Sequence, residues 1–258
     1  MSKTVMMIHG MWGGPWYWEK FKNHLTAEGY RCIIPTLRYH DIKPTDPPDP
    51  ALGTTSLLDY AADLEADINK LEEKPILIGH SMGGLLAMIL AARNLAAAAV
   101  ALTPAAPAGT NAITPSVIKS FFSVQSKWGF WKKPMRQTYN EAVYSMLNLL
   151  PPEEQKEAYS KFVYESGLAA FQIGYPYLDS QKASRVDVTS VRCPLLIIGG
   201  KEDRITPASV IRKVAKKFDN RADYKEFVDH AHWIIEEPGW EDVAGYVSTW
   251  LEQKLADK

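Results

Sequence analysis

The stretch that decides the fold reads PILIGHSMGGLLAM, from Pro75 to Met88. It begins with a continuous apolar run typical of a fully buried strand and ends with a longer apolar segment that predicts a buried helix. Between them lies a G-x-S-x-G sequence at residues 79–83, with Ser81 at its centre. Alone this motif is common, but between a strand and a helix it indicates a sharp turn that lifts the serine Oγ clear of the sheet. Ser81 is therefore the candidate nucleophile, and the alternative is a glycine-rich turn with an incidental serine.

Short apolar runs alternate with longer segments of helical period along much of the chain. The runs span residues 5–8, 32–35, 75–79, 98–103, 195–199 and 224–228. Helical segments are predicted at residues 15–28, 56–72, 207–217 and 240–254. This alternation is typical of a parallel sheet with helices on both faces. We therefore expect an α/β fold with a mostly parallel central sheet of about six strands.

One long segment does not follow the alternation. It has no clear strand, several helical stretches and a concentration of aromatic residues. We interpret residues 105–185 as a helical cap inserted into a core made of residues 1–104 and 186–258; the alternative is a long run of ordinary core helices. The proline-rich segment 40–53 predicts a surface loop.

Composition excludes several classes of protein. A chain of 258 residues, 46% of them hydrophobic, is long enough for one large α/β domain. A net charge of −1 argues against binding nucleic acid or an anionic membrane through bulk electrostatics. Two cysteines, Cys32 and Cys193, exclude a disulfide scaffold and a four-cysteine zinc site, and we expect both to be buried thiols. With no secretory leader and no apolar run of roughly 20 residues, we expect a cytoplasmic protein outside the membrane.

A serine hydroxyl becomes a good nucleophile only when a correctly oriented base takes its proton. Among six histidines, His230 and His232 follow the last predicted strand, at the sheet edge where such sites assemble. We expect only one of the two to face Ser81, and we favour His232, which precedes Trp233 and the turn into the last predicted helix. His80 lies inside the turn and fits a packing role, whereas His40 has no obvious partner. A metal site built on His-x-His lacks a third ligand nearby.

Asp203 is the candidate for the orienting acid. It ends the sequence GGKED at residues 199–203, directly after a predicted strand. Two glycines followed by an acid at a strand's carboxyl end suit a carboxylate turned back toward the sheet. Glu202 is the alternative acid. If it has no role in catalysis, Glu202 is simply a solvated charge in the loop. The chain order is then Ser81, Asp203, His232.

Backbone N–H groups next to the nucleophile and after the first strand are expected to stabilise an oxyanion. The first is that of Met82. The second belongs to the loop HGMWGG at residues 9–14, where Met11 is the preferred donor and Trp12 the alternative.

Aromatic residues of the cap and of the loop after the first strand suggest an apolar substrate pocket. We place Trp12, Trp128, Trp131 and Trp233 in it. The alternative is packing between cap and core, because aromatic side chains stabilise interfaces for the same reasons that they bind ligands.

Together these motifs resemble the esterases and lipases of the α/β-hydrolase fold, and the resemblance covers the chain end to end. His9-Gly10, GHSMG, Gly200-x-x-Asp203 and His232-Trp233 occur in that family's order. The sequence HGMWGGPWYW at residues 9–18 is similar to the branch that contains plant methylesterases and hydroxynitrile lyases. The lyases carry a lysine directly after the catalytic histidine, and Trp233 at that position makes the lyase activity a poor match.

The resemblance implies a serine hydrolase that cleaves small apolar or aromatic carboxylic esters through an acyl-enzyme. It implies no cofactor and no metal, a small-molecule ester as the partner, and a monomer or homodimer. Thioesterase, lactonase, carbon–carbon bond hydrolase and acyltransferase chemistry use the same residues, and a small-molecule receptor is a further alternative. The sequence Asp229-His230-Ala231 departs from the family's glycine-containing turn, so His230 also stays a candidate.

Overall fold

The computed structural model describes residues 3–256, and its centre is one sheet of six parallel strands. Their order across the sheet is β2-β1-β3-β4-β7-β8. The bounds are β1 Thr4–Ile8, β2 Arg31–Ile33, β3 Ile76–His80, β4 Ala98–Leu102, β7 Leu195–Gly200 and β8 Asp223–Phe227. All six predicted strands are confirmed, and with them the expected α/β class with a parallel sheet.

The strand register brings the carboxyl ends of the central strands to one edge. Ile8 lies opposite Gly79 in the β1–β3 pair, and Leu102 lies opposite Ile198 in the β4–β7 pair. The central strands β3 and β4 are buried throughout, as their continuous apolar runs predict for a sheet covered on both faces. The loops that follow β1, β3, β4 and β7 therefore gather at the same edge.

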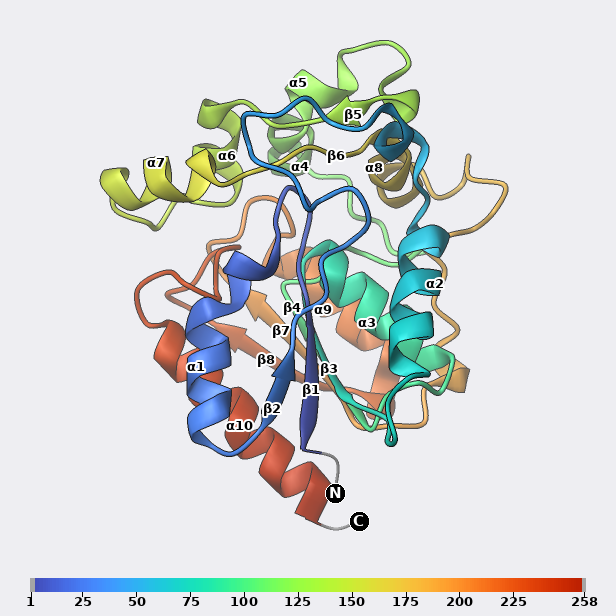
Figure 1. Ribbon diagram of the computed structural model, residues 1–258, viewed down its shortest axis with the longest axis vertical. Helices are drawn as coiled ribbons and strands as arrows, with labels where there is room; N and C mark the ends of the chain where they lie inside the picture. Colours follow the sequence, from blue (N-terminus) through green and yellow to red (C-terminus); the bar gives the residue numbers. More distant parts are fainter. Residues whose placement is uncertain (1–2, 257–258) are drawn as a thin grey trace.

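Helices cover both faces of the sheet. Figure 1 shows α1 and α10 on one face and α2, α3 and α9 on the other. Their bounds are α1 Glu19–Ala27, α2 Leu57–Ile68, α3 Met82–Ala92, α9 Ala208–Phe218 and α10 Trp240–Ala256. Short 3-10 turns complete this part of the chain at η1 Pro15–Trp18, η2 Pro50–Thr54, η4 Val188–Ser190 and η5 Asp219–Arg221. None of the helices within residues 3–256 has the length and apolar character needed to cross a membrane.

Residues 105–185, called the inserted segment below, lie over the carboxyl ends of the strands (Figure 1). The helices are α4 Pro115–Ser120, α5 Phe122–Gln125, α6 Tyr139–Ser145, α7 Pro152–Ser160 and α8 Gly167–Gly174, with a turn η3 at Phe130–Lys132. Two short strands, β5 Pro134–Met135 and β6 Glu165–Ser166, pair antiparallel. The sequence predicted no strand here, because two residues are too few to show an alternating pattern.

The predicted surface loop at residues 40–53 is confirmed over residues 41–51, none of which is buried, but it is wrong at both of its ends. His40 is 4% exposed and Leu52 is fully buried. The inserted segment covers them: Ser166 Oγ of β6 donates to the Thr55 carbonyl at 2.6 Å. Proline content signals an irregular backbone, but it does not reveal which other part of the chain packs on that backbone.

Cys32 and Cys193 form no disulfide in the described part of the chain, in agreement with the sequence-based expectation. Cys32 lies in the edge strand β2 and Cys193 lies just before β7, and both are half-buried rather than fully buried.

Candidate active site

Ser81 occupies a strained turn between β3 and α3. Its backbone has φ 56° and ψ −119°, a conformation that costs a non-glycine residue on the order of 1–3 kcal/mol. The turn is held by the Ser81 N–H, which donates to the Leu102 carbonyl of the neighbouring strand at 3.0 Å. The side chain is half-buried and lines a cavity, and its Oγ has no hydrogen-bond partner among residues 3–256.

Two glycines allow the backbone to approach this turn. A Cβ on Gly10 would lie 2.9 Å from Ser81 Cβ, and a Cβ on Gly83 would overlap the Ile8 carbonyl. Real side chains do not adopt such separations, so the loop after β1 and the start of α3 reach their positions only as glycine. The glycines of both sequence motifs thus bring the loop after β1 against the serine.

Asp203 and His232 form a buried pair at the same edge of the sheet. The carboxylate Oδ2 lies 2.8 Å from His232 Nδ1, and both side chains are fully buried. An Nδ1–H that donates to the carboxylate leaves Nε2 as the acceptor of the imidazole. That Nε2 is buried and has no partner among residues 3–256. Glu202, the alternative acid, takes no part in this pair.

Thr206 completes the surroundings of Asp203. The N–H groups of Ile205 and Thr206 donate to Asp203 Oδ1 at 2.9 and 2.8 Å. The Thr206 hydroxyl lies 2.7 Å from Oδ2 and 3.2 Å from His232 Nδ1. Thr206 was not among the residues predicted from the sequence. A local signal exists, because an aspartate side chain in a turn commonly accepts the N–H groups of the residues just after it.

His80 links the serine turn to the histidine loop. Its Nε2–H donates to the His232 carbonyl at 2.8 Å, and the two rings are 4.8 Å apart. Burial, reinforced by His232, holds the pKa of His80 well below its usual range, so the ring is neutral. His80 was expected to pack, and it also fixes the backbone of the residue that carries the candidate base.

His230, the alternative base, points away from the serine turn. Its Nδ1 lies 2.9 Å from Glu237 Oε1, and the same oxygen accepts the Ala231 N–H at 2.7 Å. His230 and His232 thus face different partners. Residues two apart on an extended strand share a face, so it is the turns on either side of this segment that separate the two side chains.

The expected oxyanion donors flank the serine. Met11 and Met82 both line the cavity beside Ser81, and neither N–H has an acceptor among residues 3–256. The loop is fixed on either side, because Tyr17 donates to the Met11 carbonyl at 2.8 Å and the Val163 N–H donates to the Trp12 carbonyl at 2.9 Å. Two free N–H groups near one hydroxyl are the arrangement that stabilises a tetrahedral oxyanion.

His9 sets the start of this loop. Its Nε2 accepts the Leu37 N–H at 3.2 Å, and its Nδ1–H donates to the Gly10 carbonyl at 2.8 Å. Burial, with a smaller contribution from the nearby His40, lowers the pKa of His9 to about 3. Neutral His9 has one donor and one acceptor nitrogen. It therefore holds the loop after β1 against the segment that follows β2.

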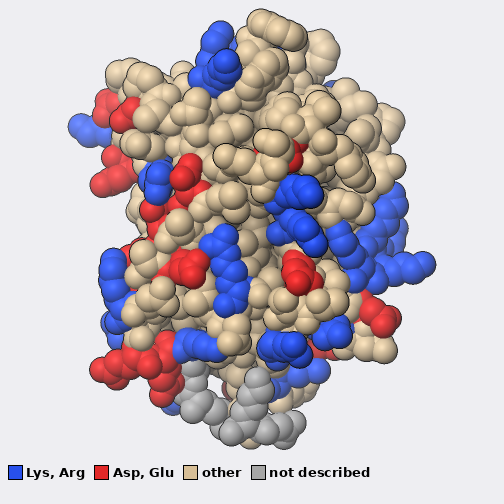
Figure 2. All heavy atoms as spheres, turned by 90° about the vertical axis from the view of Figure 1, so that its right-hand side faces the viewer, with Lys and Arg blue, Asp and Glu red and all other residues tan. Residues whose placement is uncertain are grey.

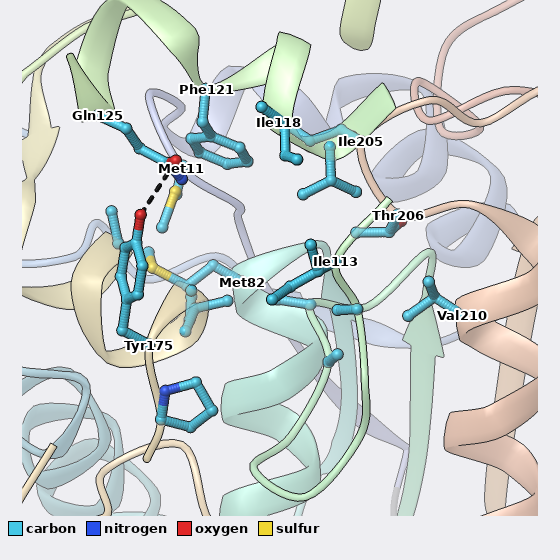
Figure 3. Close-up of a pocket in the computed structure, with 18 of the residues that line it drawn as sticks. Met11, Met82, Ile113, Ile118, Phe121, Gln125, Tyr175, Ile205, Thr206 and Val210 are labelled. Carbon is cyan, nitrogen blue, oxygen red and sulfur yellow. Dashed lines mark hydrogen bonds between the residues drawn. The ribbon is translucent and has the colours of Figure 1, made fainter. Parts of the chain in front are cut away.

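The serine opens into a cavity of about 620 Å³ between the core and the inserted segment. Figure 3 shows Met11 and Met82 on its core side and Phe121, Gln125 and Tyr175 on the side of the inserted segment. Most of the lining is aliphatic or aromatic, and no Asp, Glu, Lys, Arg or His is among the described residues that line it. This cavity suits an uncharged, largely apolar ligand.

Of the four tryptophans expected at the pocket, only Trp12 lines the cavity. Trp128 is 87% exposed and meets Trp131 edge to face, while Trp131 packs on Phe171. Trp233 is buried against Tyr17 at 4.7 Å between ring centroids. Aromatic content identified the segment that forms the wall, but the wall itself is mainly aliphatic, with isoleucines at 113, 118, 173 and 205.

A second buried polar cluster joins the inserted segment to the core. His40 Nε2 lies 3.1 Å from Glu165 Oε2, and the Tyr60 hydroxyl donates to Glu165 Oε1 at 2.6 Å. His40 Nδ1 lies 3.0 Å from the Arg38 carbonyl, so both ring nitrogens face acceptors. His40 therefore has a partner that the sequence did not reveal, 125 positions away on β6.

Comparison with known families finds one family model, described as alpha/beta hydrolase fold, that matches residues 3–238. Among curated proteins, the chain is similar to Methylesterase 18 of Arabidopsis thaliana, with 36% identity over 81 residues. That match covers 31% of this chain and 29% of the relative. Methylesterase 4 of the same organism is 33% identical over 91 residues, which are 34% of this chain and 33% of that protein. These matches therefore span about a third of the relatives' length.

Solved structures share the fold over nearly the whole chain. An extracellular alpha/beta-hydrolase from a Paenibacillus species has a TM-score of 0.74 and 16% identity, covering 95% of this chain and 98% of its own. The methylesterase MES16 from Arabidopsis has a TM-score of 0.71 and 13% identity, and the match covers 96% of this chain and 98% of that chain. The monoacylglycerol lipase of Paleococcus ferrophilus has a TM-score of 0.70 and 22% identity, and the match covers 97% of this chain and 94% of that chain.

Proposed function

We propose that this chain, which belongs to the α/β hydrolase fold family, is a serine hydrolase that cleaves carboxylic esters. One observation carries the proposal: Asp203 holds Nδ1 of His232 at 2.8 Å, and the His232 ring lies 4.8 Å from that of His80, the residue before Ser81. Curated relatives named as methylesterases support the same reaction class. A buried carboxylate–imidazole pair near an unbonded serine hydroxyl is the arrangement that activates a serine for acyl transfer.

The unpartnered Nε2 of His232 accepts the Ser81 proton as Oγ forms a bond to the ester carbonyl carbon. The carbonyl oxygen becomes an oxyanion, to which the Met11 and Met82 N–H groups donate. When the bond to the alcohol oxygen breaks, His232 gives its proton to the departing alcohol. Asp203 keeps the imidazole in the required tautomer and stabilises its positive charge.

Water completes the cycle. His232 accepts a proton from water as the hydroxide oxygen bonds to the acyl carbon, and it returns that proton to Ser81 Oγ as the acid leaves. The chemistry draws on side chains and backbone N–H groups of this chain and requires no cofactor or metal.

The cavity favours an uncharged ester with an apolar acyl or alcohol group. Its described lining has no charged side chain, so a charged substituent would lose hydration without gaining a counter-charge. Ile113 and Tyr177 line the cavity and are 71% and 83% exposed, which extends the apolar surface outward. In Figure 2 the upper right of the visible face is mainly uncharged, while Lys and Arg side chains gather below it.

A panel of p-nitrophenyl esters tests the proposal on the wild type and on Ser81→Ala. We expect the variant to lose at least about a thousandfold in kcat, because the nucleophile is gone while the oxyanion donors remain. Ser180→Ala, at an exposed position of the inserted segment, is the matched control and should retain wild-type activity. Wild-type turnover that survives in Ser81→Ala would contradict the proposal.

A further inference from the structure

Two polar side chains of the inserted segment form a hydrogen bond in the cavity wall. The Tyr175 hydroxyl donates to Gln125 Oε1 at 3.2 Å (Figure 3). Gln125 is the last residue of α5, and Tyr175 directly follows α8. The pair therefore bridges two helices of the inserted segment, whereas Ser81 reaches the cavity from the core.

This bond leaves the amide nitrogen of Gln125 free. Gln125 Nε2 carries two hydrogens, and no acceptor for them exists among residues 3–256. Tyr175 holds the amide in this orientation, because its own ring is fixed by stacking on Phe171 at 5.4 Å and by Phe130 at 6.4 Å. The result is an oriented hydrogen-bond donor in the cavity wall.

The surroundings of the amide are apolar. Phe121, Val124 and Ile173 line the same cavity, and its described lining includes no charged group. A donor next to apolar surface is costly once water is displaced, unless the ligand supplies an acceptor. A neutral oxygen is the acceptor that fits, since the cavity offers no cation to balance a carboxylate.

We infer that Gln125, oriented by Tyr175, is a specificity-determining residue that binds a carbonyl or ether oxygen in the substrate. This oxygen lies in the part of the ester that contacts the inserted segment, whereas the bond that is cleaved lies at Ser81, on the core side of the cavity. The inference rests on the proposed ester hydrolysis and narrows its substrate class to neutral esters with a second oxygen function along an otherwise apolar chain.

An oxygen scan along the acyl chain tests this inference. The substrates are p-nitrophenyl octanoate and its analogues in which one methylene beyond the third carbon is replaced by an ether oxygen. The wild type should show a KM lower by about threefold to tenfold for one oxygen position, as expected for one net hydrogen bond, with little change in kcat.

Variants assign the effect to the pair. Gln125→Leu should abolish the preference, because leucine keeps the volume of the side chain and removes the donor. Tyr175→Phe keeps the ring and removes the hydroxyl that orients the amide, so it should weaken the preference. Gln253→Leu makes the same change at an exposed site on α10, so this control variant should keep the wild-type preference for one oxygen position.

The outcomes separate the two claims. Equal KM values along the wild-type series, or a preference that survives in Gln125→Leu, would overturn the role of Gln125. If Gln125→Leu fails to fold by thermal melting, Tyr175→Phe decides, and an unchanged preference there overturns the inference. A folded wild type that cleaves none of these esters would instead contradict the proposed hydrolysis.

Discussion

Thr206 shows how much of the candidate site depends on one residue that carries no reacting atom. Its hydroxyl lies 2.7 Å from Asp203 Oδ2 and 3.1 Å from the Thr103 carbonyl, and its N–H binds Asp203 Oδ1. These contacts hold both oxygens of the Asp203 carboxylate in place. The orientation of the His232 ring, which is bonded to that carboxylate, is therefore fixed as well. A residue that contacts a catalytic side chain in this way orients the reacting group without itself touching the reacting atoms of the substrate.

Thr206→Val should therefore lower kcat for esters by about tenfold with little change in KM, because it loosens the carboxylate and preserves the volume of the side chain. Thr206→Ser, which restores the hydroxyl, should recover most of the rate. Thr189→Val removes a similar contact to Asp187 in an exposed turn and serves as the control. A Thr206→Val enzyme with wild-type kcat would show that the hydroxyl does not position Asp203.

The loop between β8 and α10 is the element that carries the candidate base. Glu237 Oε1 accepts the His230 Nδ1–H and the Ala231 N–H, one residue before His232. Glu237 is fully buried, so this oxygen acts as an internal brace of the loop. His80 and Thr103 hold the loop from the other side through the His232 carbonyl.

Glu237→Ala should lower the free energy of unfolding by about 2–4 kcal/mol, since it leaves a buried N–H group and a buried imidazole without their acceptor. It should also reduce kcat at temperatures where the variant is still folded, because the base is held less firmly. Glu237→Gln retains the acceptor oxygen and should recover most of both properties. Chemical unfolding and ester kinetics on the same samples measure them, and full activity in Glu237→Ala would contradict the bracing role.

At the scale of the whole molecule, His40 and Glu165 join the core to the inserted segment as a buried ion pair. Burial alone would lower the pKa of His40, but the charge and hydrogen bond of Glu165 outweigh it and raise the pKa above its usual value. Burial alone would raise the pKa of Glu165, but His40, Tyr60 and the Ser166 N–H hold it below its usual value. Both shifts favour the charged pair in the folded state.

The sign of the pH dependence follows from these directions. The contribution of His40 is complete below the unfolded histidine pKa, about 6.5, and is lost as pH rises through the raised pKa of the folded state. The contribution of Glu165 is present above the unfolded glutamate pKa, about 4.3, and is lost as pH falls through its lowered folded value. The pair therefore contributes most between about pH 4.3 and 6.5.

Glu165→Gln should destabilise the protein by about 3–5 kcal/mol in that window, because it leaves His40 buried without its anion. The loss should shrink as the pH rises above the window, where the wild type also begins to lose the pair. Glu153→Gln, which removes an exposed pair with Lys156, should change stability by less than about 1 kcal/mol at any pH. Thermal melts from pH 5 to 9 measure the difference, and a Glu165→Gln effect independent of pH would exclude the charged pair.

The sheet and its order of motifs were predictable because their signals are local. A strand such as Ile76–His80 is apolar at every position, and the G-x-S-x-G turn lies within five residues of sequence. Asp203 and His232 were also predictable, since the carboxyl ends of parallel strands meet at one edge. The structure places these two residues in contact, as their order along the chain suggested.

What the sequence did not predict depends on contacts between distant segments. The partner of His40 is Glu165, and no local pattern marks either residue as half of a pair. The pocket wall was assigned to tryptophans from composition, whereas Trp233 packs in the core and Trp128 faces solvent. Which face of a helix points into a cavity depends on how the inserted segment lies on the core.

The most direct test of the central claim is to map a fluorophosphonate adduct by peptide mass spectrometry on the folded wild-type protein. The probe reacts only with a serine whose hydroxyl is activated by a base and whose oxyanion is stabilised. We predict a single adduct on the peptide that contains Ser81, formed much more slowly in His232→Gln and absent in Ser81→Ala. An adduct on another residue, or no adduct on folded wild-type protein, would contradict the assignment of Ser81 and His232.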